Sequence, residues 1–598
     1  MHSPGERSDV ALLAAYLRPE RRPLAALVSV LVVAMLLPVA GPVILGQVVD
    51  AALEGRPITA LLVLAATFLL VTLTADAMQL VITFWSVKLA WRIGNRLRLD
   101  LARHALGLDL TWHGSHSPGL LIERIDGDVE AIVRFSSTAV LNLFGNAILL
   151  VGTLVVAVWI EWRAGLLIGG VALLSVLLMQ RLRRLAVPSY DAEREVQAEL
   201  YGDLEERLGG LEDLRANGAA AYTVHRLRQS SSRWWHRARH ASLRGDGAYA
   251  LAAATFTAGS VATLALAIGL HLGDQLSLGA VLALFRFSQM VRQPLEAVAE
   301  QITEFQRAVA GSRRAARLLA TNPVLVDGPG ELLPTGPLSV DFDEVRFAYP
   351  DEPERPVLDG LDLHIPAGTV VGVVGRTGSG KTSLGRLLLR FWDVTGGTLR
   401  LGGVDVRQAT QEHLRTRVGV VTQEVQILRA TLRDNLTLLG AVPAEDDAMH
   451  MALTEIGLGP WVEGLPHGLD TALQGDTELS AGQAQLLAFA RILLTDPGLV
   501  VLDEATSRLD PHTEQLITAA TERVLRGRTV VIIAHRLETL DRADQILVVE
   551  AGRIAEHGRR EKLLDDPDSR FAMLRRRALD TAARGRGSAE DDLAEELR

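Results

Sequence analysis

Residues 375–382 read GRTGSGKT, and they follow the apolar run TVVGVVG at 369–375. The pattern GxxxxGK[ST] after such a run predicts a loop that cradles phosphate groups with backbone N–H groups at the start of a helix. The chain holds 61 lysine and arginine residues, but only Lys88, Lys381 and Lys562 are lysines. A compact ammonium can fold back into a glycine-rich loop, whereas a planar guanidinium is too large. The stretch therefore predicts a phosphate-binding site at Lys381.

Length and composition bound the classes of protein to consider. A chain of 598 residues is too long for one core, so at least two domains are expected. The mean hydropathy of +0.20 is too high for an ordinary soluble enzyme. The net charge of −10 argues against a nucleic-acid partner, and the absence of cysteine excludes disulfides, cysteine nucleophiles and zinc–thiolate sites.

Apolar stretches in the first half predict six membrane-spanning helices, because each can cross ~30 Å of hydrocarbon. These stretches lie at 23–48, 60–86, 138–160, 164–186, 247–271 and 276–298. Buried helices of a large soluble core are the disfavoured alternative. The only basic residues in the short connections 49–59, 161–163 and 272–275 are Arg56 and Arg163. The long connection 187–246, by contrast, is dense in arginine. The positive-inside rule then places the long connections and both termini on the cytoplasmic side of a bacterial inner (plasma) membrane.

The second half has a different pattern, with short apolar runs such as VGVVTQ, GLVVLDE and TVVIIAH. Such runs are typical of parallel strands covered on both faces. We therefore expect a multidomain membrane protein, in which an all-α six-helix transmembrane domain precedes an α/β P-loop NTPase domain. The expected parts are a cytoplasmic N-terminal elbow without a cleavable signal (1–22), the transmembrane domain (23–322), a Pro/Gly-rich linker (323–337), the α/β domain (338–575) and a charged tail (576–598).

Both long connections contain a break in an otherwise helical pattern. The breaks are HGSHSPGLLIERI at 113–125 and RLGGLEDLRANGAA at 207–220. Each could hold a short transverse helix or a plain turn.

Polar residues follow several of the predicted strands. Asp503 and Glu504 end GLVVLDE, and we expect the first to reach Mg²⁺ through water and the second to polarise an attacking water. His535 follows the next strand and could contact a γ-phosphate. Gln423 ends VGVVTQ and could sense Mg²⁺ and the γ-phosphate, while Tyr349 could stack on adenine or simply pack in the domain.

Together these residues resemble the ATP-binding cassette (ABC) transporters, specifically half-transporters of the exporter fold. ELSAGQ at 478–483 is similar to that family's signature LSGGQ, and Lys381, Ser480, Asp503 and His535 stand in the family's order. The resemblance implies ATP and Mg²⁺ as cofactors and ATP hydrolysis as the reaction. It also implies two cassettes that sandwich two ATP molecules, so that a second half-transporter is required.

The resemblance assigns roles residue by residue. Tyr349 would stack on adenine, Glu504 would be the catalytic base, and His535 would be the switch histidine. Phosphate would be bound by Gly375, Arg376, Thr377, Gly378, Ser379, Gly380, Lys381, Thr382 and Ser383. Thr382, Gln423 and Asp503 would surround Mg²⁺. Ser480, Gly482 and Gln483 would contact ATP on the opposite cassette, and Asp510 would lie in the loop that links the two sites. The break at 113–125 would touch its own cassette, and the break at 207–220 would touch the partner's.

Departures from the family pattern favour a heterodimer. Ala481 replaces a glycine of the signature, QGDTELSAGQ looks about two residues short, and SRLD stands where SALD is common. In heterodimeric exporters, the half that keeps the catalytic glutamate typically carries the weaker signature. A homodimer is the alternative.

Polar groups inside the predicted spans are candidates for cargo contacts, because burying them in lipid is costly. They are Asp76 in the second span and Arg286, Gln289 and Arg292 in the sixth. Arg286 could bind cargo, pair with an acid or snorkel to the surface, whereas Arg292 is more typical of a structural role. The leading interpretation is an ATP-driven exporter of lipophilic or amphipathic small molecules, lipids or peptides, in contact with membrane lipid. The alternatives are an importer of metal–siderophore complexes, a peptide-processing exporter, disfavoured by the lack of cysteine, and a non-transporting ATP-binding regulator.

Overall fold

A computed structural model describes residues 15–474, 479–503, 511–534 and 537–577. The chain divides into two compact units. The first, here called the helical unit, comprises Met1–Gly107 and His116–Asn322. The second, here called the α/β unit, comprises Leu108–Ser115 and Pro323–Arg598.

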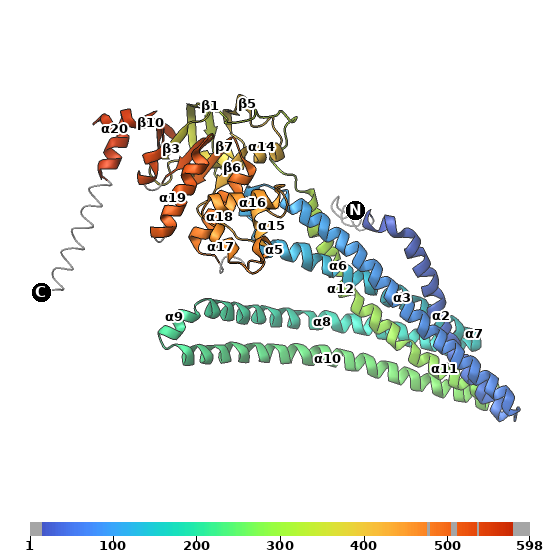
Figure 1. The fold of residues 1–598 in the computed structure, drawn as a ribbon. Helices are drawn as coiled ribbons and strands as arrows, with labels where there is room; N and C mark the ends of the chain where they lie inside the picture. The colour runs from blue at the N-terminus through green and yellow to red at the C-terminus, as the bar shows by residue number, and fades with distance from the viewer. Residues whose placement is uncertain (1–14, 475–478, 504–510, 535–536, 578–598) are drawn as a thin grey trace. The chain divides into compact units, whose positions relative to one another are not determined.

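The described part of the helical unit is built from long helices joined by short turns (Figure 1). Its elements are η1 (Arg18–Glu20), α2 (Arg21–Leu53), α3 (Ile58–Leu106), α5 (Pro118–Ile122), η2 (Glu123–Gly127), α6 (Asp128–Ala139), η3 (Val140–Gly145), α7 (Asn146–Ile160), α8 (Trp162–Gly209), α9 (Leu211–Ala216), α10 (Ala220–Leu272), α11 (Leu278–Met290) and α12 (Arg292–Ala320).

Five helical stretches among the described residues are long and apolar enough to cross a membrane. They are Ala15–Leu53, Ile58–Leu106, Pro118–Ile160, Trp162–Leu182 and Ala220–Leu272. The sixth predicted span, 276–298, is not among them because its helix is interrupted, with α11 ending at Met290 and α12 beginning at Arg292. Pro294 lies in the first turn of α12, where the missing proline N–H costs no helical hydrogen bond.

Close backbone packing joins α2 to α11 at the ends where the turns 54–57 and 273–277 lie. A Cβ atom at Gly279 would lie 2.1 Å from the carbonyl oxygen of Gly46, so only glycine allows this approach. The Asp50 carboxylate accepts hydrogen bonds from the Gly279 N–H at 2.7 Å and from the Ser277 hydroxyl at 2.6 Å. The carboxylate thereby satisfies a free N–H group at the start of α11.

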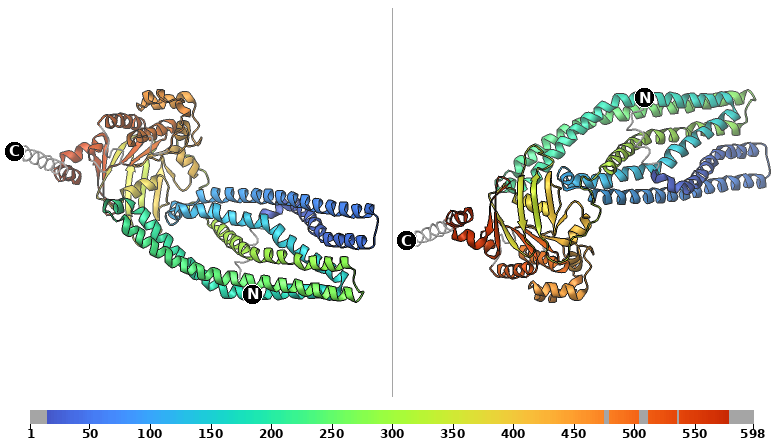
Figure 2. Two further views of the ribbon diagram at one scale, coloured as in Figure 1. Left: turned by 90° about the horizontal axis from the view of Figure 1, so that it is seen from below. Right: turned by 90° about the horizontal axis from the view of Figure 1, so that it is seen from above.

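The helices α8 and α10 run side by side and are joined at one end by α9 (Figure 2). Trp234 Nε1 donates to Glu193 at 2.8 Å, and the Ser230 hydroxyl donates to Asp203 at 2.9 Å. The predicted break at 207–220 therefore contains a short helix. Apolar side chains stay exposed at this tip, with Leu208 60% and Leu211 43% accessible.

The α/β unit contains two sheets. The four-stranded antiparallel sheet has the order β2-β1-β4-β5, and the six-stranded sheet has the order β10-β9-β3-β8-β7-β6. Its strands are β1 (Val340–Phe347), β2 (Leu358–Ile365), β3 (Val370–Val374), β4 (Gly396–Leu401), β5 (Val404–Asp405), β6 (Val418–Val421), β7 (Leu499–Asp503), β8 (Thr529–Ile533), β9 (Gln545–Glu550) and β10 (Arg553–Arg559). Five of the six strands in the larger sheet run parallel, as their apolar sequences predict.

The helices described in the α/β unit are α4 (Leu110–Gly114), α13 (Lys381–Leu388), α14 (Gln411–Arg417), α15 (Leu432–Thr437), α16 (Asp446–Glu455), α17 (Gly459–Glu463), η4 (Gly468–Asp470), α18 (Ala481–Thr495), α19 (Pro511–Leu525), η5 (Leu537–Arg542) and α20 (Arg560–Asp565). Of these, α13, α14, α18 and α20 pack on strands of the six-stranded sheet. Strands β3 and β8 are buried along their whole length, which leaves side-chain chemistry to their ends.

The short helix α4 belongs to the α/β unit although its sequence lies far upstream. Trp392 Nε1 donates to the Thr111 hydroxyl at 2.7 Å, and the Asp109 carboxylate accepts from the backbone N–H groups of Val324 and Leu325. The predicted break at 113–125 overlaps the contacting segment at 113–115, but that segment begins earlier, at Leu108. The second short helix of this region, α5, lies in the helical unit.

Candidate functional site

The carboxyl ends of three neighbouring strands meet at one edge of the six-stranded sheet. Ile533 at the end of β8 is in register with Val373 of β3 and with Asp503 of β7. The loop 375–380 leaves the sheet at this edge, and Gln423 follows β6 by two residues. In an open parallel sheet, ligands bind beyond the carboxyl ends of the strands.

Glycines give the loop 375–380 its shape. Gly378 and Gly380 have φ values of 82° and 106°, in the left-handed region that L side chains rarely adopt. A Cβ atom at Gly380 would lie 2.7 Å from the Leu358 side chain, and one at Gly375 would lie 2.2 Å from the carbonyl oxygen of Val549. The loop is therefore held against β2 and β9, with no room for a larger residue at Gly375 or Gly380.

The Lys381 side chain folds back across this loop. Its Nζ donates to the carbonyl oxygens of Gly375 at 2.7 Å and Arg376 at 3.1 Å, and the residue is 5% exposed. The Ser379 hydroxyl is also buried, and its oxygen has no hydrogen-bond partner among the described residues. A compact cation and an unpaired hydroxyl at the start of helix α13 fit phosphate oxygens as ligands.

Three oxygen-bearing side chains lie at this edge of the sheet or in the first turn of the helix that follows the loop. Thr382 is exposed in the first turn of α13, Gln423 is exposed beyond β6, and Asp503 is half-buried at the end of β7. Hydroxyl, amide and carboxylate oxygens are the ligands that a hard divalent cation such as Mg²⁺ prefers.

Tyr349 lies beside the helix that follows the loop. Its hydroxyl and that of Ser383 are 2.9 Å apart, and Arg386 donates to the same tyrosine oxygen at 3.3 Å. Its ring meets Phe347 and Trp392 edge to face, with centroids 4.9 and 5.2 Å away. The sequence predicted an aromatic contact at Tyr349 but not these partners, although Trp392 in RFWDV offered an aromatic signal.

The signature-like residues lie on a separate helix, α18, which packs against α15, α16 and α19. Ser480 caps this helix: its hydroxyl accepts from the Gln483 N–H at 3.1 Å, and Gln483 Oε1 accepts from the Ser480 N–H at 3.0 Å. Ala481 is exposed and Gly482 is buried. Deeper in α18, burial lowers the pKa of Arg491, whose Nε donates to the Asn435 carbonyl at 2.8 Å.

Three predicted functional residues, Glu504, Asp510 and His535, lie outside the described residues. Glu504 follows Asp503 directly, and His535 lies two residues beyond the end of β8.

Family models match both parts of the chain. A model described as ABC transporter transmembrane region matches residues 24–295, and one described as ABC transporter matches residues 358–507. An ATP-dependent lipid A-core flippase of Chromohalobacter salexigens is 31% identical over 82% of this chain and 84% of its own. The chain belongs to the ABC transporter family. It is a half-transporter of the exporter type, an ATP-binding, ATP-hydrolysing multi-pass membrane protein with a cytoplasmic cassette.

Other relatives and one solved structure agree with this assignment. A multidrug efflux ATP-binding/permease protein of Mycobacterium bovis is 33% identical over 78% of this chain and 39% of its own length. A mycobactin import ATP-binding/permease protein of Mycobacterium tuberculosis is 32% identical over 82% of this chain and 57% of its own. The structure of a bacterial Atm1-family ABC exporter with ATP bound has the same fold, with a TM-score of 0.76 and 23% identity over 93% of this chain and 98% of its own.

Proposed function

We propose that the loop 375–383 binds the phosphates of ATP and that Thr382, Gln423 and Asp503 hold Mg²⁺ beside them. The observation that carries this proposal is the Lys381 ammonium, folded across a glycine loop at the edge of the sheet where β7 ends in Asp503. Bound Mg²⁺ would neutralise charge that develops on the phosphate oxygens. Tyr349, held by Ser383 and Trp392, would present its ring to adenine.

Glu504 acts as the general base in this proposal. Its carboxylate takes a proton from a water molecule while the water oxygen attacks the γ-phosphorus. The bond from that phosphorus to the bridging oxygen breaks, and ADP keeps the electron pair. His535, beyond the end of β8, contacts the γ-phosphate.

A second half-transporter completes each site. Ser480, Gly482 and Gln483 lie at the start of α18, an element separate from the phosphate loop, and they would contact ATP bound to the partner's cassette. The exposed Leu208 and Leu211 at the tip beside α9 would dock on that same partner. The exposed methyl of Ala481, where the family pattern has glycine, supports a partner of different sequence, so a heterodimer is proposed over a homodimer.

The proposed cargo is a lipophilic or amphipathic molecule moved out of the cytoplasm. The lipid flippase and multidrug efflux relatives support this class. The mycobactin import relative supports the second candidate, import of a metal–siderophore complex.

The test of the heterodimer is to purify the chain alone in nanodiscs and to measure its molecular mass and ATP turnover. We expect ATP binding with little turnover, and full turnover after a co-encoded half-transporter with an intact LSGGQ is added. Full turnover by a homodimer of this chain would overturn the heterodimer. A folded chain that does not bind ATP would instead overturn the assignment of the loop 375–383 as the phosphate-binding loop.

A further inference from the structure

A stripe of polar side chains runs along α3 inside its membrane-spanning part. Thr72, Asp76, Gln79 and Thr83 follow the spacing i, i+4, i+7 and i+11, so they share one face of the helix. All four are exposed in the chain. The two threonine hydroxyls donate to the backbone carbonyls of Phe68 and Gln79. No hydrogen bond or ion pair is recorded for the Asp76 carboxylate within the described part of the chain.

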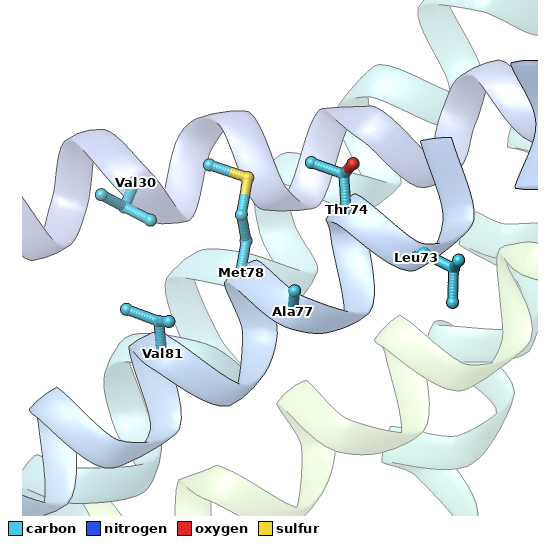
Figure 3. A pocket seen from close by; sticks show the side chains of 6 residues that line it. All are labelled: Val30, Leu73, Thr74, Ala77, Met78 and Val81. Atoms are coloured by element: carbon cyan, nitrogen blue, oxygen red, sulfur yellow. The ribbon is translucent and has the colours of Figure 1, made fainter. Parts of the chain in front are cut away.

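A different face of α3, apolar except for Thr74, forms a groove against α2. Figure 3 shows the side chains of Val30 from α2 and of Ala77, Met78 and Val81 from α3 around this groove. At ~100° per residue, the groove-lining positions of α3 and the polar stripe point about 160° apart. The helix therefore offers hydrocarbon-like surface on one side and polar surface on the other.

The polar stripe cannot be a lipid-facing surface. A carboxylate in contact with acyl chains is costly. Asp76 lies inside the apolar stretch 60–86, ~24 Å along the helix from the start of that stretch and ~15 Å from its end at ~1.5 Å per residue, so its short side chain reaches neither end of the stretch. The stripe therefore faces water, cargo or another protein chain.

Arg286 is the exposed cation on α11, and it lies at a different depth in the membrane from Asp76. Arg286 lies eight residues from the start of α11, or ~12 Å along it, whereas Asp76 lies ~27 Å along α3 from Ile58. Both helices start after short turns on the same side of the membrane, so the two charges differ in depth by about 15 Å. Such a separation is too large for a direct ion pair between Asp76 and Arg286.

We propose that the α3 stripe lines the transport cavity and that Asp76 binds the positively charged group of a lipophilic cation, which makes such cations the preferred cargo. This inference rests on the proposed function as a transporter of amphipathic molecules, and it narrows that class by charge. Thr72, Gln79 and Thr83 would solvate the polar part of the cargo, while its apolar part contacts neighbouring side chains such as Leu80, which is 73% exposed.

The experiment measures equilibrium binding of two probes of the same shape and opposite charge, tetraphenylphosphonium and tetraphenylborate. The transporter is purified through a tag on this chain, so that any partner half accompanies it, and empty nanodiscs give the background. We expect the native protein to bind tetraphenylphosphonium more tightly than tetraphenylborate. Asp76→Asn should weaken its binding by at least about tenfold, while tetraphenylborate binding stays equal or improves.

Two variants and one assembly measurement complete the design. Asp76→Glu keeps the charge and should retain tetraphenylphosphonium binding. Thr74→Val, which changes a threonine on the groove face of α3 away from the stripe, is the matched control and should leave the binding of both probes unchanged. Unchanged cation binding in Asp76→Asn, an equal loss of both probes, or loss of assembly by size-exclusion chromatography would each overturn the proposal, the last two by making Asp76 structural. Binding is measured without ATP, so a failure of ATP turnover would count against the proposed function and leave this test intact.

Discussion

The charged groups of the two candidate functional regions, one in each unit, have opposite environments. In the α/β unit, Lys381 is 5% exposed and its ammonium is held by two carbonyl groups of its own loop. In the helical unit, Asp76 and Arg286 are exposed in segments that belong in a membrane. The phosphate loop is thus preformed by one chain, because local backbone geometry fixes it. The polar surface of the helical unit requires a cavity, a cargo or a partner before it is satisfied.

The largest predicted effect on ATP binding tests the preformed loop. Lys381→Ala removes a charge-assisted contact to phosphate of about 1.5–3 kcal/mol, so the Kd for ATP should rise by ~10–100-fold. Lys562→Ala, which changes a lysine of α20 in the same unit, is the matched control and should leave the Kd unchanged. Equal Kd values for both variants, measured by isothermal titration of ATP, would mean that the loop does not bind phosphate through this ammonium.

Two glycine variants with a smaller expected effect distinguish backbone strain from steric contact within the same loop. Gly380→Ala forces an alanine to φ 106° and brings its Cβ against Leu358, which should cost about 1–3 kcal/mol or more and lower the thermal unfolding temperature of the α/β unit. Gly378→Ala has φ 82° but open space around the added atom, so it should cost less. If the two variants unfold at the same temperature, the close packing of the loop on β2 does not contribute.

The smallest effect concerns an exposed cluster in the α/β unit. Hydrogen bonds from Arg433 lower the pKa of Asp446 and of Asp470. A lowered folded-state pKa gives stability that is present above the unfolded value near pH 4 and is lost as the pH falls through the folded value. Arg433→Gln should therefore lower the unfolding temperature slightly at neutral pH, and the difference from the native protein should vanish in acid. A difference that persists at roughly pH 2 would point to packing instead.

The sequence could predict the parts of the molecule that local patterns specify. GRTGSGKT after an apolar run predicted the glycine loop and the ammonium inside it, and the apolar runs predicted the parallel strands. Contacts between distant segments carry no such pattern. The Trp392–Thr111 hydrogen bond joins residues 281 positions apart, so the sequence placed the contacting segment at 113–125 instead of from Leu108 onward. The interruption between α11 and α12 was missed because hydropathy alone does not record where a helix stops.

In the candidate site too, the sequence predicted residues that a local pattern marks but not their contacts with distant segments. The pattern singled out Tyr349 and Lys381, but the Ser383 and Arg386 contacts to the tyrosine hydroxyl depend on how β1 packs beside α13. The polar stripe on α3 was visible only in part, since Asp76 stood out by charge while Thr72, Gln79 and Thr83 gained meaning from their shared face and exposure.

The most direct test of the account is the ATP turnover of the transporter, purified through a tag on this chain together with any partner half, with and without Glu504→Gln. A general base contributes roughly 10²–10⁴-fold, so turnover at the site of this chain should fall by at least about a hundredfold while ATP binding stays within about threefold. Turnover that survives Glu504→Gln unchanged would contradict the assignment of hydrolysis to this chain.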